Sequence, residues 1–319
     1  MTRDRFRSGL ALLVVTATLS ACGAPLHGAP AVGSEVSAGG LHVEADAGTG
    51  ISDPIRMDAL ADRIDHATQL ATERGAEVTV AVLDRATGTR SVGGVDEPIE
   101  TASVVKLFIA DDLLFREAIG EIVLTDDDYD LIGAMLTRSD DSAASLLWDA
   151  FDGPEIVDRV VERHSLPGTV APPDFWWNTV TTASDILTWY DDLLSGGGGL
   201  DEPASARIVG YLIESEPTGT DGYDQQFGLP DGLSYAVDLG SKAGWMCCLD
   251  SQWIHLSTGF FGNDHRYVVA VLSRETVTYP DPEYDGWFLP DTSMYDASDD
   301  ESARHARETV TMVVETVFG

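Results

Sequence analysis

The chain has 319 residues and is strongly acidic, with 54 aspartates and glutamates against 19 lysines and arginines and a formal net charge of −35. This excess of negative charge makes nucleic acid an implausible partner. It is typical of proteins exported into salty surroundings, where carboxylates stay hydrated and their repulsion is screened. The seven histidines show no metal-protease or paired zinc-ligand spacing, so we expect no metal and no cofactor.

The first 21 residues have the features of an export signal. Arginines at positions 3, 5 and 7 precede an apolar run over 10–19, which is too short to span a bilayer. The run leads into Leu19-Ser20-Ala21-Cys22, which resembles a bacterial lipobox, so Cys22 is predicted to be the lipidated first residue of the mature protein. The alternative is an ordinary cleavage site beside an incidental cysteine. The predicted location is extracytoplasmic, with a lipid anchor in the bacterial cell membrane.

Residues 22–52 are rich in Gly, Ala, Pro and Ser without an apolar period, which predicts a flexible tether. Residues 53–319 are enough for one large domain with a full core, or for two closely packed lobes. We expect this domain to be a monomer.

The first elements of the domain are a helix and two strands. Apolar residues over 57–71 repeat at intervals of three and four, which predicts an amphipathic helix that ends near Arg74-Gly75. Valines alternate at 78, 80 and 82 and predict a strand, followed by a turn over 86–89 and a second strand near 90–92. The stretch from about 100 to 230 is predicted to be mostly helical.

Strands return over 238–242, 252–260 and 266–273, and a helix closes the chain. Ser298 with Glu301 predicts a capping box for that helix, and Ala306, Val310, Val313 and Val317 supply its buried stripe. Between the last strand and the helix, residues 280–301 carry eight carboxylates. We expect a solvated acidic loop there, with a calcium-binding loop as the alternative.

Cys247 and Cys248 are neighbours in the sequence. Because adjacent Cα atoms lie about 3.8 Å apart across a trans peptide, below the usual range for a relaxed disulfide, we expect both to be reduced and packed.

Helices at both ends of the domain flank strands from both ends, with a helical insertion between them. This order predicts an α+β fold with an all-helical lobe, and an active site between the lobes.

The chain has only two lysines, and each completes a motif. Lys106 closes Ser103-Val104-Val105-Lys106, and Lys242 opens Lys242-Ala243-Gly244. Arginine carries the remaining basic charge, so a position that needs a deprotonatable amine is one where lysine cannot be replaced. A third element, Ser139-Asp140-Asp141, lies between the two. Each motif alone is a weak signal, but the three together are specific.

The motifs allow serine acyl-transfer chemistry. Lys106 lies one helical turn after Ser103, so its amine can remove the serine's proton if its own pKa is lowered. Ser139 could pass a proton to the leaving group, or merely cap the next helix. Lys242 would ease deprotonation of Ser139 and attract a substrate carboxylate. The alternatives are an exposed lysine after a capping serine, a surface lysine and a turn glycine.

Two further features would complete such a site. Gly244 would let the substrate backbone approach the strand edge. The backbone amides of Ser103 and Trp245 are candidates for an oxyanion hole.

Together the motifs resemble those of the class A β-lactamase and penicillin-binding protein superfamily, which are Ser-x-x-Lys, Ser-Asp-Asn and Lys-Thr-Gly. The likeness covers residues from about 55 to 319. It implies an antiparallel sheet flanked by the N- and C-terminal helices, with Ser103 as nucleophile, Lys106 as base, Ser139 as proton shuttle and Lys242 as the carboxylate-side cation. The short interval from Ser103 to Ser139 implies a trimmed helical lobe.

Two departures from the family pattern concern substrate binding. Asp141 replaces the asparagine of the second motif, so an amide donor becomes a carboxylate that only accepts hydrogen bonds. If Asp141 contacts Lys106, its charge would raise the pKa of that lysine and slow acylation. Ala243 replaces a threonine and removes a hydroxyl that the family uses on the substrate carboxylate, so recognition should be looser or different.

A third departure concerns hydrolysis of the acyl-enzyme, for which the family uses a loop glutamate and an asparagine four residues later. Asp174 and Asn178 have that spacing, but aspartate is one methylene shorter. The aromatic residues 175–177 between them could instead plug a loop against the core.

The resemblance implies a lipid-anchored serine hydrolase that acts through an acyl-enzyme on a β-lactam or a peptidoglycan-derived amide or ester. A slow penicillin-binding or D,D-peptidase-like protein is a variant of this prediction. The alternative is a non-catalytic envelope lipoprotein that binds peptidoglycan or a partner, because one fold can host both uses.

Overall fold

The computed structural model describes residues 57–171, 174–279 and 300–319. Contacts divide the chain into Met1–Ala47 and Gly48–Gly319, and all described residues belong to the second unit. The predicted signal, Cys22, the tether and most of the acidic segment, over 280–299, lie outside the described residues. Within the described ranges, no helix is long and apolar enough to cross a membrane.

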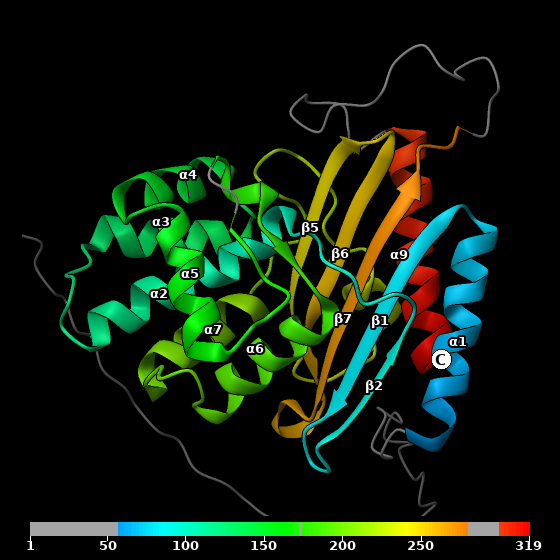
Figure 1. Ribbon diagram of the computed structural model, residues 1–319, viewed down its shortest axis with the longest axis horizontal. Coiled ribbons are helices and arrows are strands. Elements are labelled where there is room, and N and C mark those ends of the chain that lie inside the picture. Colours follow the sequence, from blue (N-terminus) through cyan, green and yellow to red (C-terminus); the bar gives the residue numbers. More distant parts are fainter. Residues whose placement is uncertain (1–56, 172–173, 280–299) are drawn as a thin grey trace, which may run out of the picture. The chain divides into compact units, whose positions relative to one another are not determined.

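A five-stranded antiparallel sheet lies at the centre of the fold, with the strand order β2-β1-β7-β6-β5 (Figure 1). Its strands are β1 (Ala76–Asp84), β2 (Thr89–Gly93), β5 (Gly240–Leu249), β6 (Gln252–Phe261) and β7 (Tyr267–Thr276). β1 pairs with β7 from Ala76 opposite Glu275 to Asp84 opposite Tyr267, so segments from both ends of the domain share one sheet. β5, which carries Lys242, is an edge strand.

The helices α1 (Met57–Glu73) and α9 (Glu301–Phe318) pack together on one face of the sheet (Figure 1). The stripe residues of α9 are buried against this face, and so are the valines that alternate along β1 and β7: Ala306, Val310, Val313, Val317, Val80, Val82, Val269 and Val271. Alternation along a strand sends neighbouring side chains to opposite faces, so the intervening residues belong to a second core. The expected flanking helices are therefore confirmed.

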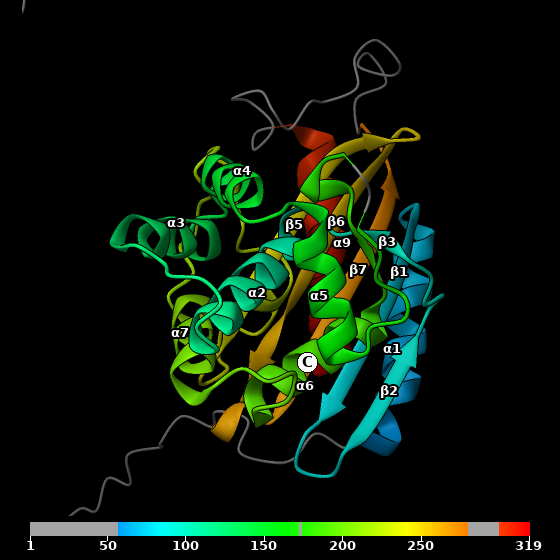
Figure 2. The ribbon, with the colours of Figure 1, turned by 60° about the vertical axis from the view of Figure 1, so that its left-hand side comes forward.

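The helical lobe lies on the other side of the sheet and contributes to that second core (Figure 2). Its helices are α2 (Lys106–Ala118), α3 (Asp126–Thr137), α4 (Asp141–Ala150), α5 (Pro154–His164), α6 (Ala183–Ser195) and α7 (Glu202–Ile213). The short α8 (Leu229–Gly232) packs against α9 instead. Three 3-10 turns are η1 (Ala102–Val105), η2 (Trp176–Asn178) and η3 (Asn263–His265). The two-residue strands β3 (Ile99–Glu100) and β4 (Val180–Thr181) pair with each other. The predicted α+β class is confirmed.

The start of α9 differs from the predicted capping box. Asp300 is the capping residue, and its Oδ1 accepts hydrogen bonds from the amides of Ser302 at 2.9 Å and Ala303 at 3.0 Å. Ser298 lies outside the described residues. A carboxylate satisfies free amides at a helix start as well as a serine does, and its charge also favours that end of the helix dipole.

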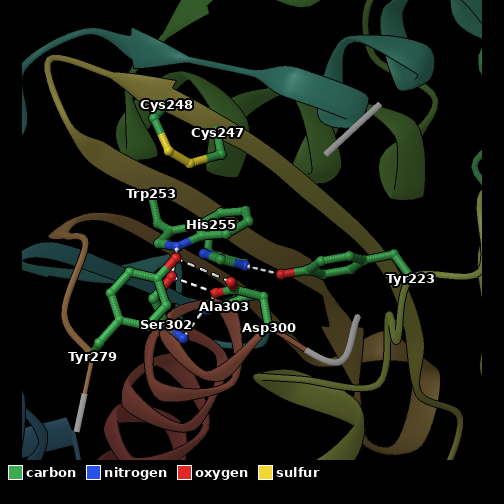
Figure 3. Close-up of a disulfide and its surroundings, with 9 residues drawn as sticks. All are labelled: Tyr223, Cys247, Cys248, Trp253, His255, Tyr279, Asp300, Ser302 and Ala303. Carbon is green, nitrogen blue, oxygen red and sulfur yellow. Dashed lines mark hydrogen bonds between the residues drawn. A yellow bond between two sulfur atoms is a disulfide. The ribbon is translucent and has the colours of Figure 1, made fainter. Parts of the chain in front are cut away.

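The two neighbouring cysteines also differ from the prediction. The structure links Cys247 and Cys248 by a disulfide near the end of β5 (Figure 3). Their peptide bond is cis and their Cα atoms are 3.0 Å apart. The prediction of two reduced thiols assumed a trans peptide bond and is wrong.

Replacing Asp300 with alanine should destabilise the fold, because two amides at the start of α9 lose their acceptor. We expect the free energy of unfolding to fall by about 1 kcal/mol in a denaturant titration. Asp300→Asn, which keeps an acceptor oxygen, serves as the control, and its free energy of unfolding should fall by less than that of Asp300→Ala. An unchanged midpoint for Asp300→Ala would show that the cap contributes nothing.

Candidate active site

Ser103 lies in the 3-10 turn η1, immediately before α2. The turn is held by the pairing of β3 with β4 and by the amide of Thr101, which donates to Thr179 O at 2.7 Å. Ala102 has a left-handed backbone with φ of 44°, a strained conformation for a residue with a Cβ. Ser103 is 6% exposed. The loop geometry therefore fixes this serine before any substrate arrives.

Gly244 of β5 packs directly on this turn. A Cβ added at Gly244 would come within 2.7 Å of Thr101 O. The glycine therefore lets the edge strand approach the backbone of η1. This close contact is a different reason for glycine from the substrate approach predicted from the sequence.

Lys106 is the first residue of α2, and its side chain is fully buried. Its Nζ donates to Ser103 Oγ at 2.7 Å and to the carbonyl of Ser139 at 2.6 Å. It also pairs with Asp141 Oδ1 at 2.5 Å. The predicted pairing of Ser103 and Lys106 over one turn is present.

Two opposing effects act on the pKa of Lys106. Burial lowers it, and the nearby Asp141 carboxylate raises it. Burial prevails because the amine is fully enclosed, whereas the Asp141 side chain is 65% exposed and partly screened by water. The predicted contact with Asp141 exists, yet the net pKa of Lys106 is lowered. The amine therefore reaches its basic form more readily than an ordinary lysine.

Ser139 lies between α3 and α4 with a left-handed backbone, at φ of 54°. The next residue, Asp140, caps α4 by accepting from the amide of Ala143 at 2.9 Å. Ser139 is therefore not needed as a cap, and its hydroxyl faces both lysines. Its Oγ lies 2.8 Å from Lys242 Nζ and 3.4 Å from Lys106 Nζ.

Lys242 extends from β5 and is 1% exposed. Its Nζ donates to Ser139 Oγ and to the carbonyl of Ala243, both at 2.8 Å. Burial, together with the neighbouring charge of Lys106, lowers the pKa of Lys242 well below its usual value. The four predicted catalytic side chains therefore form one hydrogen-bonded chain along which protons can move.

Trp245, Ala243 and Asp221 all lie near Tyr223. The indole of Trp245 stacks on Tyr223 at a centroid distance of 4.8 Å and donates to Asp221 Oδ2 at 3.2 Å. The methyl group of Ala243 joins the same apolar cluster as Tyr223. Asp221 was not predicted, because it lies in the loop before β5 and belongs to no motif.

Tyr223 forms a buried pair with His255. The Tyr223 hydroxyl lies 2.7 Å from His255 Nε2, and Figure 3 shows this contact. Burial lowers the pKa of His255 to about 3, so its imidazole is neutral at physiological pH. This pair packs beneath the site and supplies no charge to it.

The described hydrogen bonds of Lys106 go to Ser103, Ser139 and Asp141, and not to the two residues proposed for deacylation. Asp174 is exposed, and Asn178 Nδ2 donates to its Oδ2 at 3.4 Å. The residue of this loop that lies against Lys106 is Trp176, whose ring centroid is 4.8 Å from Nζ. Trp176 is buried and donates through Nε1 to Ser145 Oγ at 3.1 Å. Of the three aromatic residues expected to plug the loop, Trp176 is buried whereas Phe175 is 54% exposed. A water-activating role for Asp174 stays a prediction.

Metal ligation finds no support in the part of the chain that the structure describes. There, no group of three or more His, Cys, Asp or Glu side chains is arranged to hold a metal ion.

Replacing Lys242 with methionine should stabilise the fold at neutral pH by about 1 kcal/mol, because a buried amine is exchanged for an apolar side chain of similar length. The folded state lowers the pKa of Lys242, so wild-type stability should rise as pH increases toward the ordinary lysine pKa. The advantage of methionine should shrink over the same range. Denaturant titrations at several pH values test this, and a less stable Lys242→Met at neutral pH would contradict it.

No protein-family model matches the chain. Proteins of Mycobacterium tuberculosis and Mycobacterium bovis, both named "Putative lipoprotein LppW", are 47% identical over 217 residues, which is 68% of this chain and 69% of each relative.

Solved class A β-lactamases and related enzymes share the fold. The reconstructed class A enzyme of the last common ancestor of Gram-negative bacteria has a TM-score of 0.59 at 22% identity, over 81% of this chain and 98% of its own. A β-lactamase from Chitinophaga pinensis has a TM-score of 0.59 at 12% identity, over 80% and 97%. A β-lactamase from Xanthomonas campestris has a TM-score of 0.57 at 17% identity, over 82% of this chain and 96% of its own. The chain therefore has the β-lactamase fold and belongs to the family of the LppW lipoproteins.

Proposed function

We propose that this chain is a lipid-anchored, extracytoplasmic serine hydrolase of the β-lactamase type, in which a β-lactam or a related amide or ester acylates Ser103. One observation carries the proposal. The buried amine of Lys106, whose pKa is lowered by its burial, lies 2.7 Å from Ser103 Oγ. A serine and a base in this geometry match the requirement for an activated nucleophile.

Acylation would begin with transfer of the Ser103 proton to the neutral amine of Lys106. Ser103 Oγ then attacks the carbonyl carbon, and the amides of Ser103 and Trp245 would stabilise the oxyanion. When the bond to the leaving nitrogen or oxygen breaks, the Ser139 hydroxyl gives that atom a proton and recovers one from the lysines. The hydrogen bond of 2.8 Å from Lys242 to Ser139 supports this route.

Hydrolysis of the acyl-enzyme has less support. In the loop that would supply the base, an indole lies against Lys106, and Asp174 is exposed. The water molecule that attacks the acyl group on Ser103 would therefore be activated mainly by the lysines. These contacts favour an acyl-enzyme that forms readily and hydrolyses slowly, as in a penicillin-binding or D,D-peptidase-like protein.

Membrane anchoring is the second part of the proposal. Leu19-Ser20-Ala21-Cys22 supports lipidation at Cys22, as does the lipoprotein name of the mycobacterial relatives.

A non-catalytic binding lipoprotein is favoured by Asp141 and Ala243, which depart from the catalytic pattern. The intact hydrogen bonds among Ser103, Lys106 and Ser139 favour an enzyme.

The proposal is tested by the intact mass of the ectodomain from about residue 50, followed from seconds to hours with a penicillin, a cephalosporin and an activated ester. We expect an adduct that persists and is absent from Ser103→Ala. Rapid loss of the adduct with release of opened drug would instead indicate an efficient β-lactamase. No adduct with any of the three, from protein shown to be folded, would leave the binding lipoprotein as the better account.

Asp141→Asn should move the pH dependence of acylation. The reactive form of Lys106 is neutral, so the acylation rate rises as pH increases through its pKa. Asp141 raises that pKa, and its removal should shift the rising limb to lower pH. Asp140→Asn is the matched control, because asparagine also caps α4 and the Asp140 charge affects Lys106 less. Equal shifts in the two variants, or none, would contradict this assignment.

A further inference from the structure

The charge around the two lysines bears on which acyl donors the site accepts, an inference that rests on the proposed function. We propose that Asp141 and Asp221 select neutral or cationic amides and esters, and that Lys242 is not a binding site for a substrate carboxylate. This reverses the role predicted for Lys242 from the sequence.

The amine of Lys242 has little capacity left for a substrate. It is 1% exposed and already donates to Ser139 Oγ and to Ala243 O. A neutral lysine amine has two hydrogens, and these two contacts use both. Burial favours that neutral form, since it lowers the pKa of Lys242 well below its usual value.

Asp141 places a negative charge where the related enzymes have an amide donor. Its Oδ1 pairs with Lys106, while the side chain remains 65% exposed. A carboxylate only accepts hydrogen bonds, so a substrate group that meets Asp141 must donate one. An anionic group would be repelled at this position.

Asp221, in the loop before β5, adds a second carboxylate. Its Oδ1 accepts from the amide of Tyr223 at 2.9 Å and its Oδ2 from the indole of Trp245 at 3.2 Å. The amide of Thr220 donates to Arg138 O at 2.8 Å, which ties this loop to the segment that carries Ser139. The Asp221 charge raises the pKa of both lysines and therefore acts within the site.

Ala243 removes one further means of binding an anion. The residue is 7% exposed and packs in the cluster of Tyr223 and Phe227, where a threonine would have offered a hydroxyl. The formal charge of −35 on the whole chain adds a long-range repulsion of anions that salt would weaken. Asp141, Asp221, Ala243 and the net charge of the chain therefore all disfavour an anionic substrate.

The test compares three acyl donors with one acyl group: benzylpenicillin, its neutral methyl ester and its cationic choline ester. The second-order rate of Ser103 acylation is measured by intact mass at low and at high salt. We expect the neutral and cationic donors to react about tenfold faster than the free acid at low salt, with a smaller difference at high salt.

Asp221→Asn should shift the ratio of anionic to neutral rates toward the anion by about threefold to tenfold. Glu73→Gln is the matched control, because it removes an exposed carboxylate at the end of α1, on the opposite face of the sheet, and should leave the ratio unchanged. A general loss of structure would slow all three donors together and would not change their ratio.

Two results would overturn the inference, and they are distinguishable. If the free acid reacts as fast as the esters at low salt, and Asp221→Asn leaves the ratio unchanged, the charge selection is wrong while the proposed function stands. If folded protein forms no Ser103-dependent adduct with any donor, the proposed function fails and this inference fails with it.

Discussion

The hydroxyl of Ser139 lies between two buried lysine amines, and the architecture of the site depends on this arrangement. Burying an amine is costly unless its hydrogens find acceptors. Lys106 finds them in Ser103 Oγ, Ser139 O and Asp141, and Lys242 finds them in Ser139 Oγ and Ala243 O. The same contacts that make burial tolerable also place the amines on the groups whose protons would move.

This arrangement requires segments that are distant in the sequence to meet within a few ångströms. The turn η1 brings Ser103, the start of α2 brings Lys106, the α3–α4 connection brings Ser139, and the edge strand β5 brings Lys242. Close backbone approach at Gly244 joins β5 to η1. Ala102 and Ser139, in the two segments that bring Ser103 and the Ser139 hydroxyl to the site, have left-handed backbone conformations. Strain of this kind persists only where the surrounding structure holds it, and it gathers at functional sites.

Asp141 and Ala243 differ from the β-lactamase motifs that the sequence resembles, Asp221 belongs to no motif, and all three change the charge or polarity of the site. Asp141 introduces a carboxylate, Ala243 removes a hydroxyl, and Asp221 holds a further charge beside Trp245. The proton-transfer groups are kept, while the groups that would bind an anion are lost or already engaged. A fold that accommodates many functions allows such a change without altering its framework.

The sequence alone determined the order of elements, because helix and strand periods are local. The valines of β1, the stripe of α9 and the Ser103–Lys106 spacing each follow from residues close together in the chain. The cap of α9 at Asp300 and the linked cysteines were missed, since several carboxylates could cap that helix and a cis peptide bond has no signature in residue types. Tertiary structure alone decided the neighbours of the two lysines and the direction in which their pKa values shift. Burial outweighs Asp141 at Lys106, Trp176 rather than Asp174 lies against that amine, and Asp221 enters the site from outside every motif. The reason is physical: a pKa depends on how much solvent and which charges surround a group, and those surroundings come from chain segments whose distance in space no local pattern records.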